Sequence, residues 1–276
     1  MQKKVISKII LVLLVMFMST PANAWVNGKK FPLYSEGTEI SRLSRSTIGI
    51  SLSLGADKKN CSAIAIGNNK FLTAAHCFTH QPDPHIPEKD LISLTIIEAS
   101  GRVVGEFTPN MLSFSKNTFI DNGILSTPND FVIVTLNTGE YFTNPLSKND
   151  MIKTRVEMNE FLETQGDMPI LRTDTDLYGL GYKQIGSSFS FQYGNYNAKK
   201  GSNQPFMILN PSPSILLNYI VNAQSFVSEP GDSGSGVYAC KPKGKAKNCK
   251  LIGLLSGRFA MGSKPAMETV PTYIIQ

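Results

Sequence analysis

The stretch GDSGSG, Gly231 to Gly236, places a serine among glycines late in a chain of 276 residues. Glycine adopts backbone conformations that other residues avoid, so two backbone N–H groups beside Ser233 could converge on one point. Alone, the stretch is equally consistent with an ordinary tight turn. Two earlier stretches bear on the choice: TAAHC, Thr73 to Cys77, and NDFVIV, Asn129 to Val134.

Three residues in these stretches could form a catalytic group. A serine hydroxyl is a poor nucleophile at neutral pH, so it needs a base that takes its proton and a third group that holds the base in the right tautomer. Ser233, His76 and Asp130 are residue types that can do these tasks. Taken separately, His76 could be a structural histidine and Asp130 a turn or capping residue.

Alternating apolar residues dominate the chain and predict an all-β protein. In TIGISLSL, residues 47–54, the side chains of Ile48, Ile50, Leu52 and Leu54 fall on one face of a strand. Similar short runs, separated by Gly, Pro, Asn or Lys-rich turns, are SAIAIG (62–67), LISLTII (91–97), FVIVTL (131–136), SILLNYIV (214–221), SGVYAC (235–240), KLIGLLSG (250–257) and VPTYII (270–275). Many short strands at this spacing indicate a sandwich or barrels.

One segment breaks the alternation. NDMIKTRVEMNEFLE, Asn149 to Glu163, contains good helix formers, with apolar residues such as Ile152 and Val156 at near-helical spacing. Asn149 or Asp150 is a candidate N-cap. We therefore expect one short helix here, connecting two β halves of the chain.

The first 24 residues predict export. Lys3, Lys4 and Lys8 precede an apolar run, Ile9 to Met18, and Ala22 to Ala24 matches the small-residue cleavage site of a signal peptide. The run is about half the roughly 20 residues that span a membrane, which argues against an anchor, and no later run is long enough. The three lysines contribute half of the formal net charge of +6, so the mature chain is only mildly basic.

Four cysteines, Cys61, Cys77, Cys240 and Cys249, allow three pairings, and export favours disulfides over free thiols. The local solution joins Cys61 to Cys77 and Cys240 to Cys249, and the first bond would close a loop of about 16 residues and stabilise the fold by about 3 kcal/mol. Neither pair has zinc-ligand spacing. KPKGKAKNCK, residues 241–250, fits a lysine-rich hairpin tip better than a nucleic-acid patch.

Taken together, these stretches resemble the chymotrypsin-like (trypsin-like) serine proteases. TAAHC matches that family's histidine motif, NDFVIV its aspartate before an apolar strand, and GDSGSG its nucleophile motif, in the family's order of His, Asp, Ser. DLYGLGY, Asp176 to Tyr182, is similar to the family's Gly-x-Gly strand, and LIGLLSG, Leu251 to Gly257, to the strand that binds substrate backbone. The resemblance runs from about residue 46 to the end of the sequence, and the combination is far more specific than any one motif.

The resemblance implies a fold of two six-stranded antiparallel β-barrels, with the active site in the cleft between them. It divides the chain into a signal peptide (1–24), an N-terminal extension or propeptide (25–45) and a peptidase domain (46–276). Within that domain, the first barrel would cover about 46–145, the crossover about 146–168 and the second barrel about 169–276.

The same resemblance assigns roles to single residues. His76 is the expected general base and acid, Asp130 the residue that orients it, and Ser233 the nucleophile, with the backbone N–H groups of Gly231 and Ser233 as the oxyanion hole. Asp121 is the rival of Asp130, but only Asp130 leads directly into an apolar strand.

One cysteine pair matches the family, whereas Cys240 and Ser235 depart from its usual pattern. Cys61 and Cys77 match its disulfide beside the histidine, whereas the usual partner of Cys240 is absent, so its pairing with Cys249 is our inference. Ser235 stands where animal members usually have glycine, a variation associated with bacterial relatives.

The resemblance also bears on specificity. Members that cut after Arg or Lys have an acid at the pocket floor, six residues before the serine, where this chain has Val227. An apolar floor leaves a buried charge without a partner, which is costly. Thr272 would shorten the same pocket, and Ser256 and Gly257 would line it. We therefore expect cleavage after small or medium apolar residues, although Glu229 near the rim could attract a basic side chain.

Activation in the animal members depends on a freshly cut apolar N-terminus, which pairs with the acid before the serine, here Asp232. Signal cleavage would leave Trp25 to Gly28, which is similar to the family's Ile-Val-x-Gly start. The alternatives are cleavage after Arg42 or Arg45, removal of a propeptide elsewhere, or another partner for Asp232.

The function implied is a secreted or periplasmic serine endopeptidase that acts on proteins or peptides through an acyl-enzyme intermediate. No cofactor, metal, nucleic acid or membrane contact of the mature form is expected, and the oligomeric state is left open. An α/β-hydrolase esterase would need glycine in place of Ser235 and the order Ser, Asp, His, so the sequence fails both tests. The alternative from another class is a protease-like binding protein that kept the fold without turnover.

Overall fold

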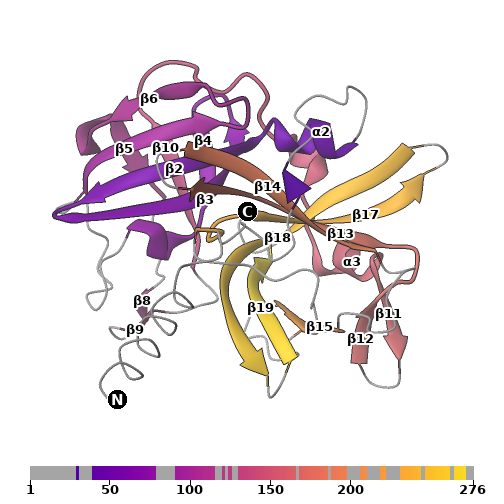
Figure 1. The fold of residues 1–276 in the computed structure, drawn as a ribbon. Coiled ribbons are helices and arrows are strands. Elements are labelled where there is room, and N and C mark those ends of the chain that lie inside the picture. The colour runs from indigo at the N-terminus through magenta and orange to yellow at the C-terminus, as the bar shows by residue number, and fades with distance from the viewer. Residues whose placement is uncertain are drawn as a thin grey trace, which may run out of the picture.

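A computed structural model gives the fold of the chain (Figure 1). It describes residues 29–30, 39–78, 91–115, 120–121, 124–125, 130–165, 168–185, 188–197, 206–209, 218–221, 231–243, 246–261 and 264–271. Within these ranges, no helix combines the length and the apolar character that crossing a membrane requires. The predicted signal peptide and the pocket residues Val227 and Thr272 lie outside the described residues.

The first half of the chain forms a seven-stranded antiparallel sheet in the order β6-β5-β2-β3-β4-β10-β7, coloured indigo to magenta in Figure 1. Its strands are β2 (Thr47–Leu54), β3 (Asp57–Gly67), β4 (Lys70–Thr73), β5 (Leu91–Glu98), β6 (Val103–Phe107), β7 (Leu112–Phe114) and β10 (Val132–Leu136). The predicted alternation in β2 is confirmed, because Ile48, Ile50, Leu52 and Leu54 are at most 1% exposed.

The second half of the chain, joined by β1 from near its start, forms a ten-stranded antiparallel sheet in the order β1-β14-β13-β17-β18-β19-β16-β15-β12-β11. Its strands are β1 (Lys29–Lys30), β11 (Leu162–Gln165), β12 (Met168–Leu171), β13 (Asp176–Ile185), β14 (Ser188–Asn197), β15 (Phe206–Leu209), β16 (Asn218–Val221), β17 (Gly236–Lys243), β18 (Ala246–Met261) and β19 (Lys264–Pro271). A separate small sheet pairs β8 (Ile120–Asp121) with β9 (Ile124–Leu125).

The prediction of a mostly β chain with antiparallel pairing is therefore confirmed. The two large sheets have seven and ten described strands rather than six each. Part of the difference comes from the edges of the second sheet, where β1 pairs with β14 and the hairpin of β11 and β12 is added beyond β15. Both additions depend on pairing between distant segments, which apolar alternation does not reveal.

Short helices join the strands. They are α2 (Glu39–Ser44), η1 (Ala75–Phe78), η2 (Pro109–Met111), η4 (Lys148–Asp150) and α3 (Arg155–Asn159), where η marks a 3-10 helix. The expected helix between the two halves exists as α3, but the predicted span of 149–163 and the predicted N-cap are wrong. Thr154 is the N-cap and accepts a hydrogen bond from Glu157 N–H, while the Glu157 carboxylate accepts one from Lys153 N–H. Val156 is 75% exposed, so the expected apolar face is not formed.

Two apolar clusters hold the fold together. One fills the seven-stranded sheet and includes residues of β2, β5 and β10. The other draws on both large sheets, with Ile64 and Leu72 from the first and Leu180, Tyr182 and Tyr238 from the second. The buried Tyr182 ring lies directly against Gly49 in β2, where an added Cβ would overlap it. The second cluster therefore joins the two halves of the chain.

The helix α2 packs onto this second cluster. Leu43 is fully buried in it, and the guanidinium of Arg42 binds the carboxylates of Glu39 and of Asp150 in η4, each at 2.6 Å. Hydrogen bonds to Glu39 and Asp150 raise the pKa of Arg42 above its usual value. The segment just before residue 46 therefore contacts the same core as the strands that follow it.

Both predicted disulfides are confirmed. Cys61 is bonded to Cys77, and Cys240 to Cys249, so all four cysteines are paired. Cys240 and Cys249 lie directly opposite each other in the β17–β18 hairpin. The lysine-rich stretch is therefore part of a stapled hairpin, as the sequence predicts.

Candidate active site

His76 and Asp130 are brought together by the pairing of two strands. β4 ends at Thr73, and the chain then turns through η1, which carries His76. β10 pairs with β4 so that Val132 lies opposite Thr73, which puts Asp130 just beyond the start of β10 and beside η1. Both side chains therefore lie at one edge of the seven-stranded sheet.

Asp130 holds His76 through two hydrogen bonds. Its Oδ1 accepts a bond from the backbone N–H of His76 at 2.8 Å, and its Oδ2 lies 2.7 Å from Nδ1. The Asp130 side chain is 1% exposed and that of His76 29% exposed. Because an ionised carboxylate can only accept, this contact favours the tautomer with the proton on Nδ1, in which Nε2 is free to accept a hydrogen bond. The rival Asp121 lies in β8 of the separate small sheet.

A serine from the other half of the chain also contacts the Asp130 carboxylate. Ser256 Oγ donates to Oδ2 at 2.5 Å, and Ser256 is 7% exposed. It lies in β18 at a register shift between Leu255 and Gly257, and such bulges redirect side chains. The sequence assigned Ser256 only to the lining of the substrate pocket. Its contact with Asp130 was missed because 126 residues separate the partners.

The loop that carries Ser233 is held by backbone hydrogen bonds from both sheets. The N–H of Ser62 in β3 donates to the carbonyl of Ser233 at 2.8 Å. On the other side, Gly234 N–H donates to the carbonyl of Leu255 at 2.8 Å, and Leu255 N–H donates to the carbonyl of Ser235 at 2.9 Å. The loop is therefore fixed between β3 and β18.

Two glycines allow this loop to take its shape. Gly231 has φ of 101° and Gly234 has φ of 82°, a region that residues with a Cβ rarely adopt. A Cβ on Gly234 would also overlap the carbonyl oxygen of Ser62 and Oγ1 of Thr73. The glycine at 234 is therefore required both for conformation and for space.

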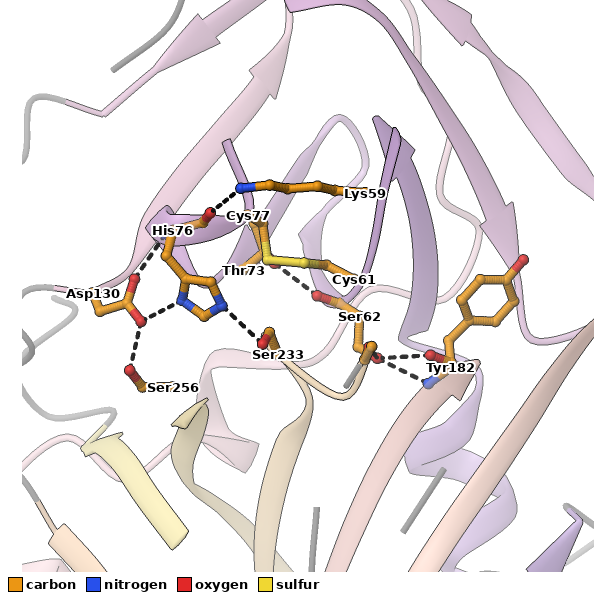
Figure 2. Close-up of a disulfide and its surroundings, with 11 residues drawn as sticks. Lys59, Cys61, Ser62, Thr73, His76, Cys77, Asp130, Tyr182, Ser233 and Ser256 are labelled. Atoms are coloured by element: carbon orange, nitrogen blue, oxygen red, sulfur yellow. Dashed lines mark hydrogen bonds and ion pairs between the residues drawn. A yellow bond between two sulfur atoms is a disulfide. The ribbon is translucent and has the colours of Figure 1, made fainter. Parts of the chain in front are cut away.

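The Ser233 hydroxyl completes a line of three side chains. Its Oγ lies 2.8 Å from His76 Nε2, on the opposite side of the ring from Asp130 (Figure 2). In this geometry the hydroxyl proton can pass to Nε2 while the carboxylate stabilises the charged ring. The arrangement can thus generate a nucleophilic oxygen.

Lys59 is a neighbour of the site that the sequence did not suggest. Its Nζ donates to the backbone carbonyl of His76 at 3.4 Å (Figure 2). Partial burial lowers the pKa of Lys59. Lys59 lies near the start of β3, in the polar stretch DKKN, which gives no signal of this contact.

The residues predicted for catalysis and for the substrate pocket thus fall into three groups. Four of them, His76, Asp130, Ser233 and Ser256, are joined by hydrogen bonds at one point between the two large sheets. Gly231 and Gly257 lie close to them along the chain, whereas Val227 and Thr272 lie outside the described residues. In the part of the chain that the structure describes, no group of three or more His, Cys, Asp or Glu side chains could hold a metal ion.

Comparison with known proteins places this geometry in a fold class. No protein-family model matches the chain, and no curated protein matches its sequence. Among solved structures, a Glu endopeptidase aligns over 93% of this chain and 96% of its own, with 14% identity and a TM-score of 0.53. A collagenase aligns over 85% and 92%, with 17% identity and a TM-score of 0.52. An inactivated protease paralogue of the scabies mite aligns over 90% and 95%, with 16% identity and a TM-score of 0.50.

These likenesses show that the chain has the chymotrypsin-like (S1-type) protease fold. The fold agrees with the resemblance drawn from the three sequence motifs. One of the similar proteins is an inactivated paralogue, so the fold by itself does not establish catalysis. The argument for activity has to come from the residues of the site.

Proposed function

We propose that the protein is a secreted serine endopeptidase that hydrolyses peptide bonds through Ser233, His76 and Asp130. The observation that carries the proposal is the continuous hydrogen-bonded line from Ser233 Oγ to His76 Nε2, at 2.8 Å, and from Nδ1 to Asp130, at 2.7 Å. An ordinary turn would not explain why the serine contacts a histidine whose second ring nitrogen is held by a buried carboxylate. This geometry and the chymotrypsin-like fold support the role that we propose for each residue.

In the proposed acylation step, His76 Nε2 takes the proton of Ser233 Oγ as the oxygen attacks the carbonyl carbon of the substrate. The N–H groups of Gly231 and Ser233 stabilise the negative oxygen that forms, each contributing about 3 kcal/mol to the transition state. His76 then gives the proton to the leaving nitrogen, the C–N bond breaks, and an ester of Ser233 remains.

In the deacylation step, water attacks the ester and gives a proton to His76 Nε2. The proton returns to Ser233 Oγ as the C–O bond of the ester breaks, which releases the carboxylic acid product. Asp130 keeps Nδ1 protonated throughout and offsets the positive charge of the ring. No cofactor is needed for these steps.

We further propose that the two large sheets correspond to the two β-barrels expected from the sequence, and that residues 1–24 direct export. The antiparallel sheets, the site between them and the two disulfides support these proposals, because disulfides form in oxidising compartments outside the cytosol. The substrates would be proteins or peptides.

We further propose that Val227 forms an apolar floor of the substrate pocket, and that cleavage therefore occurs after small or medium apolar residues. An unpaired basic side chain buried against valine would lose its hydration without a partner. A peptide library cleaved by the mature protein should therefore show apolar residues before the cut bond. Cleavage mostly after Arg or Lys would overturn this part of the proposal.

Labelling with a fluorophosphonate probe tests the function directly. The mature wild-type protein should be labelled, whereas Ser233→Ala and heat-denatured protein should not, and kcat on a peptide substrate should fall about a millionfold in the variant. A folded wild-type protein that the probe does not label would favour the alternative, a protease-like binding protein. N-terminal sequencing of the same sample shows whether an uncleaved leader or extension accounts for the absence of labelling.

A further inference from the structure

We propose that Ser62 is a positioning residue for Ser233. Its buried hydroxyl fastens the seven-stranded sheet to β13 and to the nucleophile loop of the second sheet, and so sets the distance between Ser233 Oγ and His76 Nε2. The inference rests on the proposed peptidase function, because that distance matters for activity only if Ser233 reacts.

The Ser62 hydroxyl contacts backbone groups of the other half of the chain. Ser62 is fully buried in β3, and its Oγ accepts a hydrogen bond from the N–H of Tyr182 in β13 at 2.8 Å. The same Oγ lies 3.4 Å from the carbonyl oxygens of Tyr182 and Gly231, and its one proton can be donated to either of them. Figure 2 shows the two contacts with Tyr182. A single side chain thus reaches both β13 and the loop that precedes Ser233.

The backbone of Ser62 is tied to both reacting residues. Its N–H donates to the carbonyl of Ser233 at 2.8 Å, and the preceding residue, Cys61, is bonded to Cys77, the neighbour of His76. Together with the contact between His76 and Ser233, these links form a closed ring through Ser62. Any movement of Ser62 relative to the second sheet therefore changes the geometry between His76 and Ser233.

The hydroxyl links this ring to β13 by a hydrogen bond. Alanine at position 62 would keep the backbone bond to Ser233 but would leave the buried N–H of Tyr182 without its acceptor. Gly231 has φ of 101°, and glycine gives the loop little stiffness of its own. The Ser62→Ala change would also remove the contact between Ser62 Oγ and the carbonyl of Gly231, at a flexible point of the loop.

The position of Ser62 distinguishes positioning from substrate binding. Because the residue is fully buried, it cannot touch a substrate, so its loss should lower kcat without raising KM. A misplacement of about 1 Å between reacting groups lowers the rate about 100-fold. We expect Ser62→Ala to lower kcat and the rate of fluorophosphonate labelling by that factor, with KM changed by less than about twofold.

The test compares Ser62→Ala with a matched control and a rescue variant. Ser44→Ala removes another buried serine hydroxyl, which donates to the carbonyl of Ser41 at 2.8 Å within α2, and should leave kcat and labelling unchanged. Ser62→Thr keeps a hydroxyl at the same position and should label faster than Ser62→Ala. Melting temperatures of all variants show that the rates refer to folded protein.

Several outcomes would overturn the proposal. Wild-type labelling of Ser62→Ala, a loss equal to that of Ser44→Ala, or a folded Ser62→Thr as slow as Ser62→Ala would each do so. A Ser62→Ala chain that does not fold would make Ser62 a structural residue, which also contradicts the proposal.

The experiment separates this inference from the proposed function. If the probe labels the wild type but no peptide is cleaved, the endopeptidase function fails while the labelling rates still decide the role of Ser62. If the wild type is not labelled, crystal structures of wild type and Ser62→Ala decide it. A Ser233–His76 contact lengthened beyond hydrogen-bond distance supports the inference, and an unchanged contact refutes it.

Discussion

The edge of the site that carries His76 and the edge that carries Ser233 are held by different parts of the chain. His76 is fixed by side chains, through the two hydrogen bonds that it donates to the Asp130 carboxylate and through the Cys61–Cys77 disulfide next to it. The loop of Ser233 is fixed mainly by backbone hydrogen bonds and by glycine conformations. Substitutions that remove side-chain groups should therefore be most harmful near His76. Substitutions that add side-chain atoms to the glycines should be most harmful near Ser233.

Among variants that keep Ser233, the largest effect is expected at the histidine edge, from Asp130→Asn. The amide has nearly the shape of the carboxylate, but its NH₂ group can stabilise the wrong tautomer of His76 and cannot offset the charge of the protonated ring. We expect kcat to fall about 10,000-fold with little change in the melting temperature. Steady-state kinetics and thermal unfolding of the same preparation check this. A loss of less than about tenfold would mean that Asp130 is not needed to orient the ring.

At the serine edge, Gly234→Ala should show the cost of an added methyl group. Alanine at φ of 82° is strained by about 1–2 kcal/mol, and the new Cβ would overlap Ser62 and Thr73. Gly101→Ala is a matched control, because Gly101 has φ of 83° and nothing within 4 Å of an added Cβ. Urea unfolding should give a loss of at least about 3 kcal/mol for Gly234→Ala and only the strain for Gly101→Ala. Equal losses would show that space at Gly234 is not limiting.

A smaller effect should follow from replacing both cysteines of the Cys61–Cys77 pair by alanine. The bond closes a separation of 16 residues, so its loss should lower the free energy of unfolding by about 3 kcal/mol. The Cys240–Cys249 pair closes only 9, and its loss should cost slightly less. Because Asp130 also holds His76, kcat of the folded variant should stay within about threefold of the wild type.

Denaturant unfolding and kinetics on both double variants check this prediction. A collapse of kcat in a stable Cys61→Ala/Cys77→Ala protein would show that the disulfide, and not Asp130, is the main support of His76. The Cys240→Ala/Cys249→Ala variant is the control, since its hairpin disulfide lies outside the ring of contacts through Ser62.

The parts of the site that the sequence predicted well are local. The glycines around Ser233, the TAAHC motif that contains His76 and the aspartate before FVIVTL each lie within a few residues of the group that they place. The strand runs were also recognisable, because a half-buried strand shows its face in every second residue. The pairing of β2 with β3 then follows because the two strands are adjacent in the sequence.

The parts that the sequence missed depend on contacts between distant segments. Nothing in LLSG marks Ser256 as a partner of Asp130, and nothing in CSAI distinguishes a buried Ser62 from a surface serine. The helix prediction failed for a local reason instead, since Thr154 and Glu157 cap a helix that begins later than the apolar spacing suggested. The number of strands in each sheet depends on which segments pair with its edge strands. The alternation of apolar residues within one strand does not contain that information.

The long separations within the site have a consequence for the timing of synthesis. His76 precedes Ser233 by 157 residues, and Asp130 precedes Ser256 by 126. At about 5–20 residues per second, a ribosome needs about 8 to 30 seconds to pass from the histidine to the serine. Throughout that interval the growing chain contains a base without its nucleophile. If the proposed function holds, the catalytic group of His76, Asp130 and Ser233 is incomplete on the nascent chain until Ser233 has been made.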